Sequence, residues 1–389
     1  MDKRIGLILT GGGARAAYQV GVLKAIAEFL PRGAHNPFPI ICGTSAGALN
    51  AAVLSINMRS FRKGVRHLDR IWKNFHANQV YRTDLVGVFN NTFYWLAGMI
   101  LSGFGINKLE QVSLLDNTPL IELLDEIMPC EKIQDNIDAG LLRALSITAS
   151  GYSSGESVTF YQGADEIAPW HGTRRIGVKT KIENKHLLAS SALPFLFPAI
   201  QINREYFGDG SMRQIAPVSS AMQLGATSIL VIGVNNGTNE LEGERNEIGS
   251  YPSLAQIAGH ALNSIFLDSM EVDLERVRKT NEIVEIMPDE IRQRSNLKKV
   301  NVLVITPSQS IEKIASHYAK ELPWTIRILM RLVGGTANQS GATLLSYLLS
   351  EGKYCKTLID LGYRDAMNRR EEIQAFLEER PHRDNEMPQ

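Results

Sequence analysis

Short apolar runs alternate with longer amphipathic segments along the first half of the chain. Ile5 to Leu9 is apolar apart from one glycine, and apolar residues then recur at spacings of three and four between Ala16 and Leu30. The run predicts a buried strand, and the spacing predicts a helix with one apolar face. A second strand is predicted for Phe38 to Cys42, followed by an apolar helix that begins near Ala46.

Further strand signals follow. Leu141 to Ala149 and Ser157 to Tyr161 flank Gly151 to Gly155, where glycine and serine residues predict a hairpin turn. Ser228 to Val234 and Val300 to Thr306 are apolar runs typical of strands buried on both faces. Strands that alternate with helices predict an α/β fold with a doubly wound, mostly parallel sheet sandwiched by helices.

The pattern changes toward the C-terminus. Apolar residues follow a helical spacing over residues 309–389, which predicts a helical C-terminal extension with a disordered tail from about Arg380. Residues 216–308 should complete the sheet and its helices. Within that stretch, residues 235–251 are polar, acidic and glycine-bearing, which predicts a flexible surface excursion.

Two apolar segments leave several interpretations open. Residues 94–101 combine aromatic and aliphatic side chains and are followed by glycines, as in a mobile lid. Residues 324–333 place Arg327 and Arg331 four apart on an apolar helix, as interfacial helices do. Core packing and a subunit interface are alternatives for each segment. A lid, a peripheral membrane contact and a homo-oligomer therefore all stay open.

Composition narrows the class of protein. With 389 residues, 44% hydrophobic and 21% charged, the chain is ordinary for a globular protein. Its 41 basic and 41 acidic residues balance, which argues against a nucleic-acid partner. The three cysteines are far apart and form no metal-ligand pattern, so we predict no metal and a reducing compartment.

Targeting signals are also weak. The N-terminal apolar run is too short for a signal-peptide core, and the longest apolar block has nine residues where a bilayer span needs about 20. We therefore expect a cytoplasmic protein, with a peripheral contact at the inner face of the membrane left open.

The most informative motif is Gly43-Thr44-Ser45-Ala46-Gly47, a G-x-S-x-G at the predicted junction of strand and helix. Glycine on each side allows the chain to make a sharp strained turn that projects the serine hydroxyl above the sheet edge. A plain structural turn is the alternative for this motif alone, because the chain has 32 glycines. We take Ser45 as the candidate nucleophile and Gly43 and Gly47 as the glycines of its elbow.

Three glycines follow the first predicted strand. Main-chain N–H groups of Gly11, Gly12 and Gly13 can converge on a phosphate or on the oxyanion of acyl transfer. The spacing also satisfies the G-x-G-x-x-A pattern of a dinucleotide fold, but that fold needs an acidic residue at the end of its second strand. The second strand here ends in Cys42-Gly43-Thr44-Ser45 instead, which disfavours a nucleotide cofactor.

Asp209 and Gly210 form the third element. Asp-Gly is a hairpin signal in its own right, and the alternating residues before it fit that interpretation. A serine nucleophile also needs a base within hydrogen-bond reach, and a carboxylate beside glycines can approach another main chain closely. The later histidines, His260, His317 and His382, follow no strand-end signal, so a Ser/Asp pair fits better than a triad.

Together the three motifs resemble the patatin-like phospholipase family, whose pattern is G-G-G-x-R/K-G, then G-x-S-x-G, then D-G-G or D-G-A. They occur here in that order, with Ser45 33 residues after Gly12 and 164 before Asp209. Leu188 to Pro194 is similar to a segment that such proteins carry between elbow and base. The resemblance covers about residues 5–215, which would form a catalytic core that carries all three motifs.

Two positions depart from the family pattern. Ala16 closes the loop where glycine is usual, and Ser211 follows Asp-Gly where glycine or alanine is usual. Both are small, and neither removes a catalytic atom. The resemblance implies hydrolysis of fatty-acyl esters through an acyl-enzyme, without a cofactor. It implies these roles: Ser45 as nucleophile, Asp209 as general base, Gly11, Gly12 and Gly13 as oxyanion hole, Gly210 as part of the base motif, and Arg15 as loop support or a phosphate contact.

Three function classes stay open. A lipid acyl hydrolase of the phospholipase A or lysophospholipase type is favoured, with a lipid or fatty-acyl ester as substrate. An acyl thioesterase or general carboxylesterase would use the same residues. A noncatalytic lipid-binding regulator is disfavoured because every catalytic position is filled.

Overall fold

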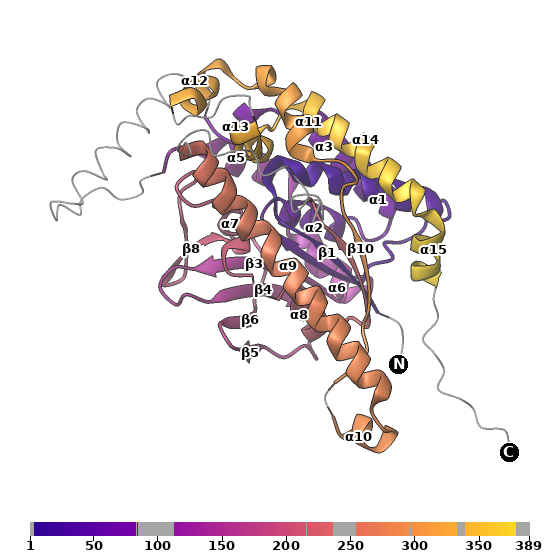
Figure 1. Cartoon of the computed structure of the whole chain (residues 1–389). Coiled ribbons are helices and arrows are strands. Elements are labelled where there is room, and N and C mark those ends of the chain that lie inside the picture. Colours follow the sequence, from indigo (N-terminus) through magenta and orange to yellow (C-terminus); the bar gives the residue numbers. More distant parts are fainter. Residues whose placement is uncertain are drawn as a thin grey trace, which may run out of the picture.

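Ten strands form one sheet in the part of the chain that the structure describes (Figure 1). The structure is a computed structural model, and it describes residues 4–82, 84, 113–214, 216–235, 254–295, 297–332 and 339–378. The strand order is β10-β9-β1-β2-β3-β4-β6-β5, with β8 paired to β3 and β7 paired to β8. The strands are β1 Ile5–Leu9, β2 Ile40–Thr44, β3 Ala144–Gly151, β4 Ser157–Gly163, β5 Trp170–Gly172, β6 Arg175–Lys179, β7 Ile200–Ile202, β8 Glu205–Asp209, β9 Ser228–Ile232 and β10 Asn301–Ile305.

Three predicted features lie outside the described residues. They are the apolar segment 94–101, the polar excursion 235–251 beyond Asn235, and the tail from Arg380.

The centre of the sheet is parallel. β10, β9, β1, β2 and β3 all run in one direction, and every residue of β1, β2 and β9 is buried. β3 then pairs antiparallel with β4 and with β8, so the sheet is mixed at that end. The predicted doubly wound α/β fold with a mostly parallel sheet is confirmed.

Helices cover both faces of this sheet (Figure 1). Leu7 and Leu9 belong to one buried apolar cluster and Ile8 belongs to another, because successive side chains of a strand point to opposite faces. The first cluster includes side chains of α1, α2, α3 and α14, and the second includes side chains of α8 and α9. These helices are α1 Ala17–Phe29, α2 Ala46–Ser55, α3 Phe61–Lys73, α8 Pro217–Gln223, α9 Leu254–Ile286 and α14 Gly352–Asn368.

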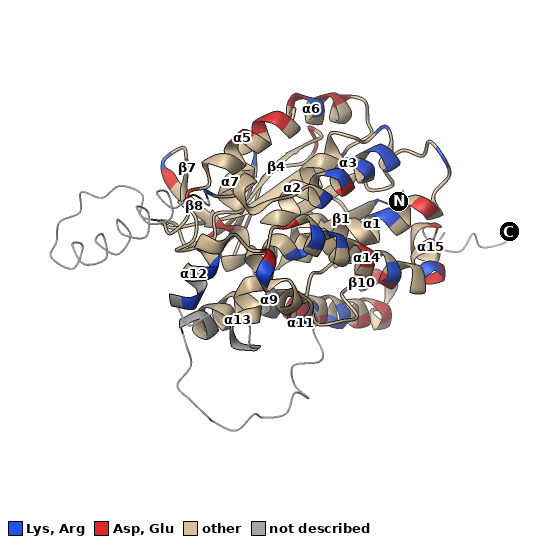
Figure 2. Cartoon of the chain, turned by 90° about the horizontal axis from the view of Figure 1, so that it is seen from above, with Lys and Arg blue, Asp and Glu red and all other residues tan. Residues whose placement is uncertain are grey.

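The region after β10 is helical, as predicted, and several shorter helices complete the described chain. Figure 2 shows both signs of charge interspersed over outer helices such as α3, α6 and α15. Among the described helices, none combines the length and the apolar character needed to cross a bilayer. The further helices are α5 Thr118–Ile127, α6 Glu131–Asp138, α7 Asn184–Ser190, α10 Asp289–Arg294, α11 Ile311–His317, α12 Trp324–Leu332, α13 Gln339–Leu348 and α15 Arg370–Glu378, with short 3₁₀ helices η1 Gly13–Ala16, η2 Ala77–Gln79, η3 Gly210–Met212 and η4 Ala319–Glu321.

Two strand predictions need correction. β2 begins at Ile40 rather than at Phe38, because Phe38 lies between two prolines, which have no N–H to donate to a ladder. β10 is not buried on both faces: Asn301 is exposed and Val302 is half-buried. The reason is its position, since β10 pairs with β9 at the edge of the sheet.

Two glycines allow α14 to lie along α1. A Cβ atom built on Gly21 would lie 2.0 Å from the main-chain oxygen of Ile359. One built on Gly362 would lie 2.1 Å from the main-chain oxygen of Tyr18. The Tyr18 hydroxyl also donates a 3.0 Å hydrogen bond to Asp365. The C-terminal region is thereby held against the N-terminal helix.

Gly362→Ala should lower the free energy of unfolding by about 1–3 kcal/mol, because the new methyl group forces α14 away from α1. Alanine in an unobstructed helix interior would instead raise it by up to about 1 kcal/mol. Urea unfolding measures the change, and Lys356→Ala, at an exposed position of α14, is the control expected to stay within about 0.5 kcal/mol of wild type. A stabilised Gly362→Ala variant would contradict the close approach.

Candidate active site

Ser45 occupies a strained turn between β2 and α2. Its main chain has φ 53° and ψ −131°, a conformation that is rare for a residue with a side chain. The flanking glycines have no room for a side chain. A Cβ on Gly43 would lie 2.5 Å from the Cα of Ala48, and one on Gly47 would lie 2.3 Å from the main-chain oxygen of Leu9. The turn therefore has the geometry of a nucleophile elbow.

The pairing of β3 explains how a distant aspartate reaches this serine. Thr44, the last residue of β2, pairs with Thr148 of β3, and Asp209, the last residue of β8, pairs with the next residue, Ala149. β4 occupies the opposite edge of β3 at both positions. β2 and β8 therefore share one edge of β3 and run in opposite directions, so that their carboxyl ends meet.

Ser45 and Asp209 make a direct contact at this meeting point. The Ser45 hydroxyl donates to Oδ2 of Asp209 at 2.6 Å, although the residues are 164 apart in sequence. The hairpin turn that the Asp-Gly signal alone would predict lies instead between β7 and β8, where Asn203 has φ 57°. Asp209 therefore ends a strand, and Gly210 begins η3.

Asp209 is fully buried, and its charge has few compensating partners. Burial raises the pKa of Asp209 from its ordinary value of 3.8 to about 6, while hydrogen bonds from Ser45 and Ser211 oppose the rise. The Ser211 N–H donates to Oδ1 at 2.9 Å. A Cβ on Gly210 would lie 2.1 Å from the main-chain oxygen of Thr148, so this step of the base motif also requires glycine.

Ser190 is a site residue that the sequence did not reveal. It is the last residue of α7, and its hydroxyl accepts a 2.8 Å hydrogen bond from the Ser45 N–H. The same hydroxyl donates to the main-chain oxygen of Thr148 at 2.6 Å. Ser190 thus ties the strained turn to β3. It lies within Leu188 to Pro194, a segment noted for its family likeness, but nothing in that pattern specifies a contact with the elbow.

The glycine loop after β1 lies beside the same site. Gly12 has φ 157° and Gly13 has φ 54°, and side chains there would collide with Val234 and with the main-chain oxygen of Tyr347. Gly13 lines the cavity that Ser45 lines, whereas Gly11 and Gly12 are not among the lining residues. The structure thus brings one end of the loop next to the serine.

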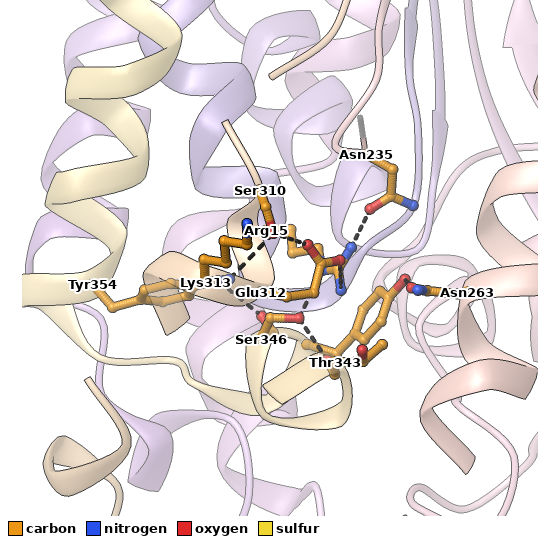
Figure 3. Close-up of polar contacts among 10 residues, drawn as sticks. Arg15, Asn235, Asn263, Ser310, Glu312, Lys313, Thr343, Ser346 and Tyr354 are labelled. Carbon is orange, nitrogen blue, oxygen red and sulfur yellow. Dashed lines mark hydrogen bonds and ion pairs between the residues drawn. The ribbon is translucent and has the colours of Figure 1, made fainter. Parts of the chain in front are cut away.

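Arg15 is buried, and it is not among the residues that line this cavity. Its guanidinium contacts Glu312, Ser346 and Asn235 (Figure 3). Of the two roles that the sequence left open, these contacts favour loop support over a phosphate contact.

A cavity beside Ser45 has an almost wholly apolar lining. Side chains from α2, α3, α5, α7 and α13 contribute to it, together with the loops between them. Such a lining suits a hydrocarbon chain. The apolar lining residues are Ala14, Ala46, Leu49, Trp72, Phe75, Val80, Tyr81, Leu120, Leu124, Leu187, Leu193, Phe197, Tyr347 and Leu348.

The histidines do not complete a triad in the described part of the chain, where the carboxylate of Asp209 accepts hydrogen bonds from Ser45 and Ser211. His260 is exposed on α9, and His317 on α11 contacts the main-chain oxygen of its neighbour Lys313. His382 lies outside the described residues. Within those residues no group of three or more His, Cys, Asp or Glu side chains is arranged to hold a metal ion, and the three cysteines are buried and free.

The fold and this pair define a class: an α/β protein with a serine elbow whose hydroxyl is bonded to a buried aspartate. In a comparison with protein families, the model of the patatin-like phospholipases matches residues 7–222, more than half of the chain. The chain therefore belongs to the patatin-like phospholipase family, as its motifs indicated.

Among curated relatives, a cGAMP-activated phospholipase of Pseudomonas aeruginosa is 26% identical over 211 residues, which cover 54% of this chain and 53% of that protein. Lysophospholipase nte1 of Aspergillus terreus is 51% identical over 51 residues, 13% of this chain and 3% of that protein. The chain thus spans about half of the first relative and a small part of the second.

Among solved structures, VipD from Legionella pneumophila is 12% identical, with 95% of this chain and 67% of that chain covered and a TM-score of 0.34. At that score the likeness bears on neither fold nor function.

Asp209→Asn should stabilise the protein at neutral pH. A carboxyl whose folded pKa is raised contributes its full stability below about 3.8 and loses it as the pH rises through about 6. The neutral amide does not have this penalty, which amounts to about 3 kcal/mol at pH 7.5. Urea unfolding should show the difference between variant and wild type growing by about 2 kcal/mol from pH 4.5 to pH 7.5.

Asp165→Asn, which removes an exposed carboxylate paired with Lys179, is the control for the loss of a surface charge. A constant difference for Asp209→Asn across this range would mean that the buried carboxyl titrates at its ordinary value.

Proposed function

We propose that this protein is a serine lipid acyl hydrolase of the phospholipase A or lysophospholipase type. The observation that carries the proposal is the 2.6 Å hydrogen bond from Ser45 to the buried Asp209 beside an apolar cavity. A hydroxyl is a weak nucleophile unless a base removes its proton, and the carboxylate of Asp209 already accepts the hydrogen bond of the Ser45 hydroxyl. Membership of the patatin-like phospholipase family and the names of the two relatives support the same class.

The first half of the reaction acylates the serine. Asp209 accepts the proton of Ser45 as the hydroxyl oxygen attacks the ester carbonyl carbon. Main-chain N–H groups of the loop Gly11, Gly12 and Gly13 hold the oxyanion, and Gly13 lines the same cavity as the serine. The C–O bond to the leaving alcohol then breaks, and protonated Asp209 returns its proton to that alcohol.

The second half releases the acid. Asp209 takes a proton from a water molecule, whose oxygen attacks the acyl carbonyl. The tetrahedral intermediate collapses, Ser45 leaves with the proton from Asp209, and the fatty acid departs. A pKa near 6 suits this exchange, because the carboxyl is ionised at neutral pH and yet is a stronger base than an ordinary aspartate.

The cavity supports an acyl chain as the recognised group. Its apolar walls would exclude water from the chain and leave the ester carbonyl beside Ser45 and Gly13, which line the same cavity. An acyl thioesterase or general carboxylesterase would use the same pair, and comparison of a lysophospholipid with an acyl thioester as substrates separates these classes. A noncatalytic lipid-binding protein would have no reason to keep a strained serine bonded to a buried base.

Of the two apolar segments that could contact a membrane, only the one that forms α12 lies among the described residues. Trp324 and Ile328 are partly exposed there, whereas Ile326 is buried. The helix is therefore packed on one side and open on another, as a peripheral lipid contact would require. The cytoplasmic location and the homo-oligomer stay predictions.

A fluorophosphonate should label wild-type protein at Ser45, and Ser45→Ala should lose both the label and hydrolysis of lysophospholipid. Loss of one member of a nucleophile and base unit typically lowers kcat by about 10⁴-fold or more. Mass mapping of the labelled peptide and a fatty-acid release assay provide the two measurements.

Ser191→Ala is the matched control, because Ser191 lines the same cavity and the serine hydroxyl bonded to Asp209 is that of Ser45. It should keep the label, and so should His317→Ala. A label that persists in Ser45→Ala would overturn the assignment of the nucleophile.

Leu120→Trp should shift the chain-length preference toward shorter acyl chains, because the larger side chain fills part of the cavity. One lost methylene contact is worth about 1–3 kcal/mol, or roughly 10 to 200-fold in kcat/KM. Ile121→Trp, one position away on an exposed face of α5, should leave the preference unchanged. If both variants keep the wild-type profile, the acyl chain binds elsewhere.

A further inference from the structure

The glycine loop is bonded to a part of the chain far outside the family match. Arg15 lies two residues after Gly13, and its guanidinium contacts side chains of α11 and α13, beyond residue 300 (Figure 3). The family model ends at residue 222. Two of the residues that hold Arg15, Glu312 and Ser346, are therefore features of this chain's C-terminal region.

The guanidinium is almost fully engaged. Nε donates to Oγ of Ser346 at 2.8 Å, and Nη2 forms an ion pair with Oε1 of Glu312 at 2.7 Å. Nη1 donates to Oδ1 of Asn235, three residues beyond the end of β9. The guanidinium carbon also lies 4.0 Å from the centroid of the Tyr347 ring. Arg15 is consequently fixed from several sides.

Glu312 supplies the charge that makes this burial tolerable. Arg15 is only 1% exposed, and an isolated buried guanidinium would be costly. The second carboxylate oxygen of Glu312 accepts a 2.9 Å hydrogen bond from Ser310, whose hydroxyl also accepts from the N–H of Lys313 at the start of α11. Contacts at the start of α11 thus orient the Glu312 carboxylate that pairs with Arg15.

The same region forms a wall against the loop itself. A Cβ on Gly13 would lie 2.4 Å from the main-chain oxygen of Tyr347, so α13 touches the loop directly. Tyr347, Leu348 and Ser350 also line the cavity beside Ser45. A displacement of α13 would therefore move both the loop and one side of the cavity.

We infer that Glu312 and Ser346 are positioning residues for the oxyanion loop, acting through Arg15. Neither side chain is among the residues that line the cavity, and both act by setting where the N–H groups of the loop point. This inference rests on the proposed function, because it assigns the loop to the oxyanion. It makes the C-terminal helices part of the catalytic unit.

Glu312→Gln in the full chain tests it. The variant keeps the shape of the side chain and removes its charge, so kcat for p-nitrophenyl butyrate, expressed per fluorophosphonate-reactive site, should fall at least about tenfold while KM stays within about twofold. Glu321→Gln is the matched control, because Glu321 makes a surface ion pair with Lys353. It should keep wild-type kcat.

Two further measurements separate positioning from general stability. Hydrogen exchange of the peptide that covers residues 10–17 should quicken in Glu312→Gln and in Ser346→Ala, and not in Glu321→Gln. The double variant Arg15→Gln, Glu312→Gln should lower kcat no further than the worse single variant, because both act on one unit. Ser346→Ala removes no charge and covers the case in which Glu312→Gln does not fold.

A lowered melting temperature with unchanged kcat per reactive site and unchanged loop exchange would overturn the inference, since Glu312 would then only stabilise the fold. Independent, multiplicative losses of kcat in the double variant would also overturn it. Wild-type protein that neither takes the fluorophosphonate nor hydrolyses esters would refute the proposed function instead, and the exchange experiment would still decide whether Glu312 holds the loop.

Discussion

The site depends on one constraint in the sheet: a single edge of β3 is shared by two strands that meet end to end. β4 fills the other edge, so β2 and β8 can only follow one another along this one. Their carboxyl ends converge, and the serine after one strand meets the aspartate that ends the other. Gly43, Gly47 and Gly210 remove the side chains that would keep these main chains apart. The buried position of Asp209, and with it the raised pKa, follows from the same convergence.

Much of this arrangement could be predicted from local pattern. The apolar runs locate most strands, and the glycines around Ser45 specify an elbow because few other residues allow that turn. The direction of β8 could not be predicted, since a strand's pairing is set by partners distant in sequence. The prediction that β10 is buried on both faces was wrong for the same reason. An apolar run does not tell whether a strand lies at the centre or at the edge of the sheet. The contact of Ser190 with the elbow could not be predicted, because a serine at a helix end often bonds only to nearby main-chain groups.

Arg15 illustrates a second limit. Its sequence neighbours left two roles open, loop support and phosphate contact, and no local signal distinguishes them. The structure favours one through partners about 300 residues away on α11 and α13. Those helices carry no motif of their own, so only the folded chain reveals that they meet the loop. The apolar cavity could not be predicted from the sequence either, because much of its lining comes from five helices that are far apart along the chain.

The place of β1 has a consequence for how the chain can be divided. β1 lies between β2 and β9, and β9 begins only at Ser228, after the last residue of the family match. A fragment cut to the matched residues would expose one whole edge of the central strand, with apolar residues on both faces. Such edges pair with other chains. The long sequence separation between β1 and β9 also gives the native sheet a high contact order. During folding, β1 can therefore pair with β9 only after most of the chain has been made.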